Sequence, residues 1–280
     1  MVETMECIVN LEDYPINSTS FAQEIRQELQ KESIVVLPSF LRPDVIQSLV
    51  KESLEHQHLA YFSNSTHNIY FTPTDTSLPP HHSHNRQSLT SRGCATADQI
   101  PNDSILKELY YNPSFQEFLC QTLEVEQLHP HGDPMSSITV HYGTEGKELG
   151  WHFDSSAFAI TLLLQKPEEG GVFEYLPNIR ERNRNENDGS NGSKSGDSFL
   201  DALKEGMEEE VQNVLDGTTS PKCADLNPGT LVIFRGRNSL HRVTKVAGNT
   251  TRILVVFAYN EKSGIRLDKE RMLKHFGRVC

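Results

Sequence analysis

Residues Trp151 to Gln165, Trp-His-Phe-Asp-Ser-Ser-Ala-Phe-Ala-Ile-Thr-Leu-Leu-Leu-Gln, form the stretch on which the interpretation of this sequence depends. His152 and Asp154 lie two residues apart in it, and side chains at such positions of a β-strand point to the same face. An imidazole and a carboxylate would therefore meet at one point. They are two of the three ligands in the 2-His-1-carboxylate arrangement that holds non-haem Fe(II) and leaves coordination positions open.

A third ligand is expected from a distant histidine on a neighbouring strand. His241, in Asn-Ser-Leu-His-Arg-Val-Thr, is the best candidate, and Arg252 follows it eleven residues later. A His-x-Asp match alone is weak, because the chain has 12 histidines and a strand histidine beside an aspartate is often only a hydrogen-bonded pair. The match gains weight here because strands are predicted on both sides of it and His241 and Arg252 precede a final strand.

The composition, with 36% hydrophobic and 23% charged residues, is ordinary for a globular protein. The net charge of −12 argues against nucleic acid or an anionic membrane as the main partner, because both require clustered Lys and Arg. Five scattered cysteines without a Cys-x-x-Cys motif favour free thiols in a reducing compartment. Without a signal-peptide pattern at the N-terminus or an apolar run of ~18 residues, the cytoplasm is the expected location.

The N-terminal half predicts supporting helices. Ser20-Phe-Ala-Gln23 has the form of a helix-capping box. Ile34 to Leu37 is an apolar run typical of a strand, and Pro43 can occupy the first turn of a second helix. From Ile105 to Leu128 the pattern is again helical, and Pro113 divides it into two helices.

Leu59 to Asp103 is rich in Ser, Thr, Pro, Asn and His and has little periodicity, so it is predicted to be mostly loop. A loop this long in a compact domain is either disordered or functional. His81, His82 and His84 lie within it, but no Cys or acidic residue stands beside them, which disfavours a second metal site.

From Ser137 the pattern changes to strands, beginning with β-branched and aromatic residues. An acidic insertion at about 181–216 interrupts them, with ten acidic and four basic residues and therefore a net charge of −6. Its centre, Asn183 to Ser198, has the composition of a flexible linker, and Phe199 to Leu215 could form an amphipathic helix. The predicted strands are 137–142, 152–154, 158–165, 172–176, 228–234, 241–243 and 252–259.

About eight strands with supporting helices fit an α+β fold with a double-sheet jelly-roll core. We expect one structural domain. Residues 1–136 would form the helical support and active-site loop region, residues 137–260 the jelly-roll catalytic core, and residues 261–280 a charged C-terminal extension.

The order of these elements between about Ser137 and Asn260 resembles that of the Fe(II)/2-oxoglutarate-dependent oxygenases. The local sequence closely resembles that of a group of the family containing free-amino-acid hydroxylases and halogenases. The residues that carry this resemblance are Trp-His-Phe-Asp…Gln-x-Pro-Glu-Glu-Gly-Gly-Val-Phe-Glu-Tyr-Leu-Pro-Asn-Ile-Arg. The resemblance implies a cupin-like double-stranded β-helix. It also implies that His152, Asp154 and His241 ligate Fe(II), while 2-oxoglutarate and O₂ take the open positions.

In this family the C5-carboxylate of 2-oxoglutarate needs a cation, and Arg252 holds the matching position. Arginine suits the role because its planar fork can bind a carboxylate bidentately; the structural alternative is an internal ion pair. Tyr142 and Thr161 could assist with hydroxyl groups or could be ordinary sheet residues. No catalytic residue beyond the metal centre is expected.

Asp154 bears on the type of reaction. Halogenating relatives lack this carboxylate and give its place to a halide, whereas this sequence keeps it. The resemblance therefore implies hydroxylation, or another oxidation such as desaturation or ring closure, with release of succinate and CO₂.

A small molecule, in particular a free amino acid, is the expected substrate. Its carboxylate would require a second arginine. The long loop offers Arg86 and Arg92, and Arg86 is favoured because it follows Leu-Pro-Pro-His-His, although it could equally be a solvated surface residue. Glu145 is a candidate for the substrate's amine. The alternatives are the same chemistry on a protein residue, and a non-catalytic metal-binding jelly-roll module.

Overall fold

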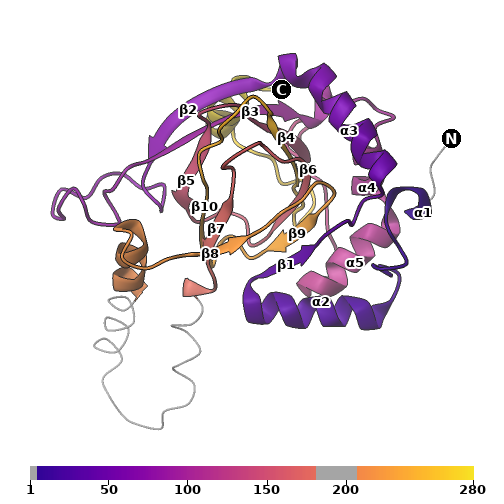
Figure 1. The fold of residues 1–280 in the computed structure, drawn as a ribbon, viewed down its shortest axis with the longest axis horizontal. Helices are drawn as coiled ribbons and strands as arrows, with labels where there is room; N and C mark the ends of the chain where they lie inside the picture. The colour runs from indigo at the N-terminus through magenta and orange to yellow at the C-terminus, as the bar shows by residue number, and fades with distance from the viewer. Residues whose placement is uncertain (1–4, 181–206) are drawn as a thin grey trace, which may run out of the picture.

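The computed structural model describes residues 5–180 and 207–280 (Figure 1). The predicted linker Asn183 to Ser198, and the first part of the helix predicted over Phe199 to Leu215, lie outside these residues. Residues 207–215 are helical. The named helices are α1 (Met5–Ile8), α2 (Thr19–Glu32), α3 (Pro43–His56), α4 (Ile105–Tyr111), α5 (Pro113–Leu123) and α8 (Lys269–Phe276). The strands are β1 (Ile34–Leu37), β2 (Tyr61–His67), β3 (Ser88–Thr96), β4 (Ile138–Gly143), β5 (Glu148–His152), β6 (Ala159–Gln165), β7 (Phe173–Leu176), β8 (Lys222–Ala224), β9 (Leu231–Phe234), β10 (Leu240–Val243) and β11 (Arg252–Phe257).

The strands form one antiparallel sheet that turns back on itself. Its order is β1-β9-β6-β11-β4-β3-β5-β10-β7-β8, and β2 pairs with β3 outside this path. Because β3 pairs with both β4 and β5, it joins two facing halves of the sheet into a nearly closed barrel, which Figure 1 shows as a ring. Along the chain, the eight strands β4–β11 alternate between these halves except at β7 and β8, which pair within one half, as in a jelly roll. The predicted α+β jelly-roll fold is confirmed.

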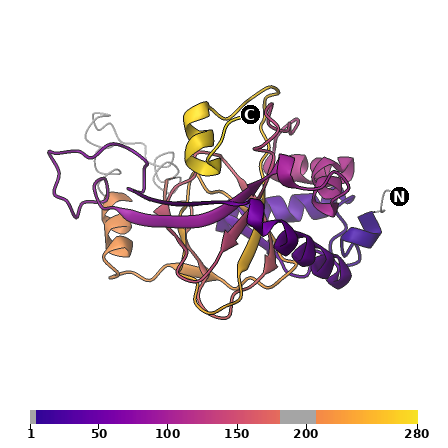
Figure 2. The same ribbon diagram turned by 90° about the horizontal axis from the view of Figure 1, so that it is seen from above.

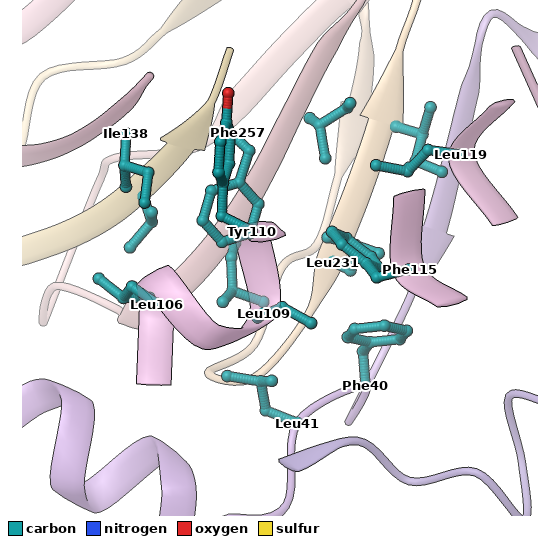
Figure 3. Close-up of a cluster of buried hydrophobic side chains, with 14 of the residues drawn as sticks. Phe40, Leu41, Leu106, Leu109, Tyr110, Phe115, Leu119, Ile138, Leu231 and Phe257 are labelled. Atoms are coloured by element: carbon teal, nitrogen blue, oxygen red, sulfur yellow. The ribbon is translucent and has the colours of Figure 1, made fainter. Parts of the chain in front are cut away.

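Strand alternation decides which side chains face the helices. On β11, Ile253, Val255 and Phe257 point outward into the largest hydrophobic cluster, together with side chains of α4 and α5 such as Tyr110 and Phe115 (Figure 3). Both of these aromatic side chains are fully buried. Burial of a large apolar side chain contributes about 1.5–3 kcal/mol, so this layer fixes the outer face of one half of the sheet.

The barrel interior and the outer face of the other half of the sheet have hydrophobic clusters of their own. Inside the barrel, Phe234 and Leu254 pack against Tyr175 from the facing half of the sheet. Outside β5 and β10, Trp151 packs against the helical residues 207–215. Arg242 lies on that outer face as well, with its Cζ 4.7 Å from the Trp151 ring centroid. The alternation leaves the neighbouring residue on β10, His241, facing inward.

The prediction of a mostly irregular segment from Leu59 to Asp103 holds for residues 68–87 but missed the two strands on either side of them. β2 and β3 pair over seven residues as a long hairpin, seen from above in Figure 2. The polar sequence concealed it because β2 is an edge strand with one solvated face, and its order comes from pairing rather than from an apolar stripe. β8 was also missed.

Most predicted helix boundaries agree with the structure. Pro43 stands at the start of α3, and Pro113 begins α5, where the Asn112 side chain accepts hydrogen bonds from two backbone amides. The helix cap expected at Ser20 is instead Ser18, whose hydroxyl accepts from the Phe21 amide at 3.4 Å. Within residues 5–180 and 207–280, no helix is long and apolar enough to span a membrane.

Candidate metal centre

His152 and His241 are brought together by strand register. β5 and β10 are antiparallel, and these two residues are directly opposite each other. Paired residues in an antiparallel sheet share a face, and the ring centroids lie 4.2 Å apart. Both imidazoles face the barrel interior, where Phe234 contacts the His241 ring at a centroid distance of 4.9 Å. The apolar surroundings limit the access of water to this side of the pair.

Asp154 joins the two histidines from beyond the end of β5. The sequence predicted that it continues the strand, but β5 ends at His152 and the Asp154 amide donates to the Gly236 carbonyl at 3.1 Å. Its Oδ1 lies 3.6 Å from His152 Nε2 and 3.5 Å from His241 Nε2. The close backbone of the segment between β9 and β10 therefore positions the carboxylate.

The hydrogen bonds of the imidazoles leave one nitrogen of each ring facing the centre. His152 Nδ1 lies 2.7 Å from the Gly150 carbonyl, and His241 Nδ1 lies 3.0 Å from the Ser239 carbonyl. A carbonyl only accepts, so each Nδ1 carries a proton, and each Nε2 faces the centre and offers a lone pair to a metal once it is unprotonated. One ligand atom from each of His152, Asp154 and His241 lies within 4.8 Å of the others. These atoms fit around one ion with bonds of about 2 Å after small side-chain movements.

The charges in this cluster stabilise one another. Burial alone would raise the pKa of Asp154, but the two imidazoles outweigh it and hold that pKa well below its usual range. Burial would lower the pKa of His241, yet the Asp154 carboxylate raises it. Burial and the neighbouring His241 lower the pKa of His152. The site is therefore an ionised carboxylate between two imidazoles, which is a donor set suited to Fe(II).

Arg252 is a buried cation at the start of β11. Its side chain is almost inaccessible to solvent, and its Nε donates to the Gly171 carbonyl at 3.1 Å. Gly171 has a φ of +62°, and a Cβ there would lie 2.9 Å from Arg252 Cδ, so glycine makes room for the side chain. Burial lowers the pKa of Arg252 to about 10, which leaves it protonated at neutral pH. In the described part of the chain, no carboxylate forms a salt bridge with it.

Arg252 lines a small pocket. Its walls include Ser91, Arg92, His141, Leu149, Val243 and Arg252. Val243 shares a face of β10 with His241, about 6.5 Å away along the strand. A ligand carboxylate at Arg252 would therefore have the rest of its molecule directed along β10 toward the two histidines. His141 was not predicted as a wall residue, because alternation puts it on the face of β4 opposite to Tyr142 but does not show which face is inward.

The structure does not bring the two predicted hydroxyl residues to Arg252. The Tyr142 hydroxyl donates to the Ser53 carbonyl at 2.7 Å, on the helix side of the sheet, so this side chain points out of the barrel. Thr161 faces the interior, but it is in register with Val256, four residues or about 13 Å along β11 from Arg252. The expectation for Tyr142 was wrong, because the residue lies on the outer face of β4 and not on the face that lines the barrel interior.

The two predicted substrate residues also lie elsewhere. Arg86 is partly exposed, and its Nη1 lies 2.5 Å from Asp216 Oδ1, so its charge is already neutralised. Glu145 is exposed in the loop between β4 and β5. In contrast, two unpredicted residues border His152: the ring centroids of His67 and Phe71 lie 6.1 and 6.0 Å from its own.

Known proteins show where this fold and sequence belong. Residues 17–275 match the family model HalD: Halogenase D. The crystal structure of an oxidoreductase of the 2OG-Fe(II) oxygenase family from Burkholderia pseudomallei is 13% identical, with a TM-score of 0.50 over 88% of this chain and 93% of that chain. The non-heme alpha ketoglutarate dependent carbocyclase SnoK from nogalamycin biosynthesis is 9% identical, with a TM-score of 0.54 over 85% and 83%. The epimerase SnoN from the same biosynthesis is 9% identical, with a TM-score of 0.51 over 86% and 84%. No curated protein matches the chain in sequence. The structural likenesses show a shared fold.

Proposed function

The chain belongs to the Halogenase D family, within the Fe(II)/2-oxoglutarate-dependent oxygenases, and from this premise we propose that it hydroxylates a small molecule rather than halogenating one. The observation that supports the proposal is the Asp154 carboxylate, whose Oδ1 lies 3.5 and 3.6 Å from the Nε2 atoms of His241 and His152. The halogenating relatives that this sequence resembles lack the carboxylate. With Asp154 in place, the position that a halide would need is filled by the protein.

In this proposal His152, Asp154 and His241 hold Fe(II), and each has a partner that orients it. The Gly150 and Ser239 carbonyls fix the two imidazoles with Nε2 toward the ion. Such partners raise the basicity of a ligating imidazole and set its orientation. Three protein ligands leave room for 2-oxoglutarate and O₂. When bound, Fe(II) and 2-oxoglutarate supply the oxidation by O₂ that removes a hydrogen atom from the substrate and releases succinate and CO₂.

Arg252 is proposed to bind the C5-carboxylate of 2-oxoglutarate. It is a buried cation whose Nε is held by the Gly171 carbonyl and whose remaining donors can bind a carboxylate bidentately. Leu149 and Val243 form apolar walls beside it. These walls exclude water, which strengthens the ion pair. A purely structural metal site would have no need of an unneutralised buried arginine, so this feature disfavours the non-catalytic alternative.

A small molecule, in particular a free amino acid, is the proposed substrate class. The mouth of the site is bordered by Phe71 and by α8, whose Lys274 Nζ lies 5.8 Å from the Phe71 ring centroid. In addition, α8 packs against β2 and β3. These contacts favour a compact substrate over an extended polypeptide, although hydroxylation of a protein residue would use the same metal chemistry.

The experiment is a product analysis by mass spectrometry. The protein is incubated with Fe(II), 2-oxoglutarate, O₂, a mixture of free amino acids, and either chloride or bromide. We expect one substrate to gain one oxygen atom in both salts, with stoichiometric succinate. Asp154→Ala should lose hydroxylation because one ligand is gone. Incorporation of chlorine or bromine by the wild-type protein would overturn the assignment as a hydroxylase, and absence of Fe(II)-dependent succinate would overturn the oxygenase assignment.

A further inference from the structure

Thr90 on β3 connects the β2–β3 hairpin to the strand that carries His152. β3 crosses between the two halves of the sheet, so that residues from Gly93 onward pair with β4, whereas Thr90 is paired with Leu149 on β5. The next amide along β5, that of Gly150, donates to the Thr90 hydroxyl at 3.1 Å. A side chain of the hairpin therefore serves as the acceptor at this point of the β3–β5 contact.

Gly150 is held at its amide, its α-carbon and its carbonyl. The carbonyl oxygen lies 2.7 Å from His152 Nδ1 and accepts its proton. The residue is buried, and a Cβ built on it would lie 2.5 Å from Ser88 Cβ and 2.7 Å from the Leu89 carbonyl oxygen. Glycine is required here because the backbone of the hairpin passes so close. Thr90 thus holds the amide of the residue whose carbonyl orients His152.

His67 on β2 fixes the direction of the Thr90 hydroxyl. Its Nδ1 lies 3.0 Å from the Asn68 carbonyl, and its Nε2 lies 2.7 Å from Thr90 Oγ1. Because a carbonyl only accepts, Nδ1 carries a proton, and the neutral ring accepts the Thr90 hydroxyl proton at Nε2. Burial is the main cause that lowers the pKa of His67, which favours the neutral ring. The lone pairs of the Thr90 oxygen are then available to the Gly150 amide.

The Thr90 hydroxyl matters because Gly150 is buried. A buried N–H without an acceptor is unfavourable, so without the hydroxyl the backbone around Gly150 would turn toward another acceptor. The N–H and the carbonyl of one strand residue point to the same side of the strand, so this movement would also displace the carbonyl that holds His152 Nδ1. The His152 Nε2, now 3.6 Å from Asp154 Oδ1, would lose its alignment with the carboxylate.

We propose that Thr90 is a positioning residue for the metal ligand His152, acting through Gly150, and that His67 directs the Thr90 hydroxyl for this task. The proposal rests on the metal centre of the proposed function. Loss of a group that orients a metal ligand typically reduces metal affinity by about 10–100-fold. The β2–β3 hairpin thereby contributes to the geometry of the metal centre, although none of the three candidate ligands lies on it.

A purely structural role for Thr90 predicts different behaviour. The hydroxyl could stabilise only the β3–β5 contact, where the Ser91 hydroxyl also accepts from a β5 amide, that of Glu148, at 3.3 Å. Its loss would then lower the free energy of unfolding without changing how the folded protein binds metal. The test therefore needs a measurement of metal binding and ligand geometry in the folded protein besides a measurement of stability.

The probe is Co(II), which accepts the same ligands as Fe(II) and has visible absorption bands that depend on ligand geometry. Metal-free wild type, Thr90→Val, Thr90→Ser and Thr66→Val are each titrated with Co(II). Valine has nearly the shape of threonine without the hydroxyl, and serine keeps the hydroxyl. Thr66→Val is the matched control, because Thr66 is an exposed residue of the same hairpin. His152→Ala identifies the absorption that comes from this centre, and urea denaturation of each metal-free protein measures its stability.

We expect Thr90→Val to bind Co(II) at least about tenfold more weakly than the wild type and to give a shifted absorption spectrum, because the His152 ring is no longer held. Thr90→Ser should recover most of the affinity and the wild-type spectrum, and Thr66→Val should match the wild type in both. His67→Leu should also weaken Co(II) binding. Combining it with Thr90→Val should cause little further loss, because the two residues act through one hydrogen bond.

The contrary outcomes are distinct from one another. Wild-type affinity and spectrum in Thr90→Val, even with a lower stability, would overturn the positioning role, and so would a Thr90→Val protein that does not fold. Equal weakening in Thr90→Ser and Thr90→Val would exclude the hydroxyl as the cause. Additive losses in the double variant would remove His67 from the proposal. A wild type with the same Co(II) spectrum as His152→Ala would instead overturn the metal centre of the proposed function itself.

Discussion

Gly236 lies so close to Asp154 that any side chain at residue 236 would displace the Asp154 carboxylate. A Cβ built on Gly236 would collide with Asp154 Oδ2 and lie 2.7 Å from its Cγ. The Gly236 carbonyl also accepts the hydrogen bond of the Asp154 amide at 3.1 Å. Asp154 stands beyond the end of β5, so strand pairing does not orient it. The glycine between β9 and β10 does so, by providing both the space and the hydrogen bond.

The first prediction is that Gly236→Ala weakens metal binding. The methyl group forces the carboxylate away from the two Nε2 atoms, and disruption of groups that orient a metal ligand typically reduces affinity by about 10–100-fold. Titration of the protein with Fe(II) without O₂ measures the change. Ser155→Ala is the control, because it alters an exposed side chain beside the same aspartate. Wild-type affinity in Gly236→Ala would contradict the account.

The metal centre could be predicted from the sequence because its residues are recognisable from a short spacing or from the apolar strands beside them. His152 and Asp154 are two residues apart, and His241 and Arg252 begin or precede apolar strands. The structure places the first three within 4.8 Å of one another. The match to the Halogenase D family over residues 17–275 confirms the predicted resemblance to the Fe(II)/2-oxoglutarate-dependent oxygenases and the cofactors that it implied.

The errors come from interactions between residues far apart in the sequence. Arg86 is neutralised by Asp216, which is 130 residues away, and nothing near Arg86 in the sequence indicates that pair. The sequence also gives no sign of which face of β4 is outward, so Tyr142 was assigned to the pocket in place of His141. That choice depends on the pairing of β4 with β11 and on the contact of Tyr142 with α3. The polar hairpin of β2 and β3 was missed for the same reason.

The second prediction is that Arg252→Lys raises the KM for 2-oxoglutarate by about 10–100-fold, because lysine keeps the charge but loses the planar fork. Steady-state succinate formation measures it. Arg242→Lys is the matched control, since Arg242 lies on the outer face of β10, in the other half of the sheet, and its Nε is 2.5 Å from Glu174 Oε2. An unchanged KM in Arg252→Lys would remove this residue from the 2-oxoglutarate site.

The third prediction concerns the layer of helices behind the sheet. Phe115 is fully buried, with ring centroids of Phe40 and Phe257 at 6.0 and 6.1 Å. Phe115→Ala should lower the free energy of unfolding by about 3–5 kcal/mol, because it removes apolar contacts and leaves a cavity. Urea denaturation gives this value. Tyr111→Ala, at a neighbouring position of the helical layer that is 54% exposed, should have a much smaller effect. Equal losses in the two variants would mean that the cluster around Phe115 does not support the sheet.

The fourth prediction concerns the C-terminal helix and pH. Burial is the main cause that lowers the pKa of His275 to about 4, and Arg92, Lys274 and Arg271 act in the same direction against an opposing effect of Asp268. An unfolded histidine titrates near pH 6.5. Between about pH 6.5 and pH 4 the unfolded chain therefore binds a proton at this residue and the folded protein does not. The stability contributed by neutral His275 is present above about pH 6.5 and is lost as the pH falls through this window.

The free energy of unfolding of the wild type, from urea titrations at a series of pH values, should therefore decrease on acidification, with His275 contributing a slope of up to about 1.4 kcal/mol per pH unit. His275→Gln has no titrating group at this position and should give a shallower slope between pH 6.5 and pH 4. Other acidic and basic groups contribute equally to both proteins, so the difference isolates His275. The control is His58→Gln, which changes an exposed histidine and should keep the wild-type slope. If wild type and His275→Gln have the same slope, His275 is already protonated in the folded protein near pH 6.5, and its partial burial within α8 does not exclude the charge.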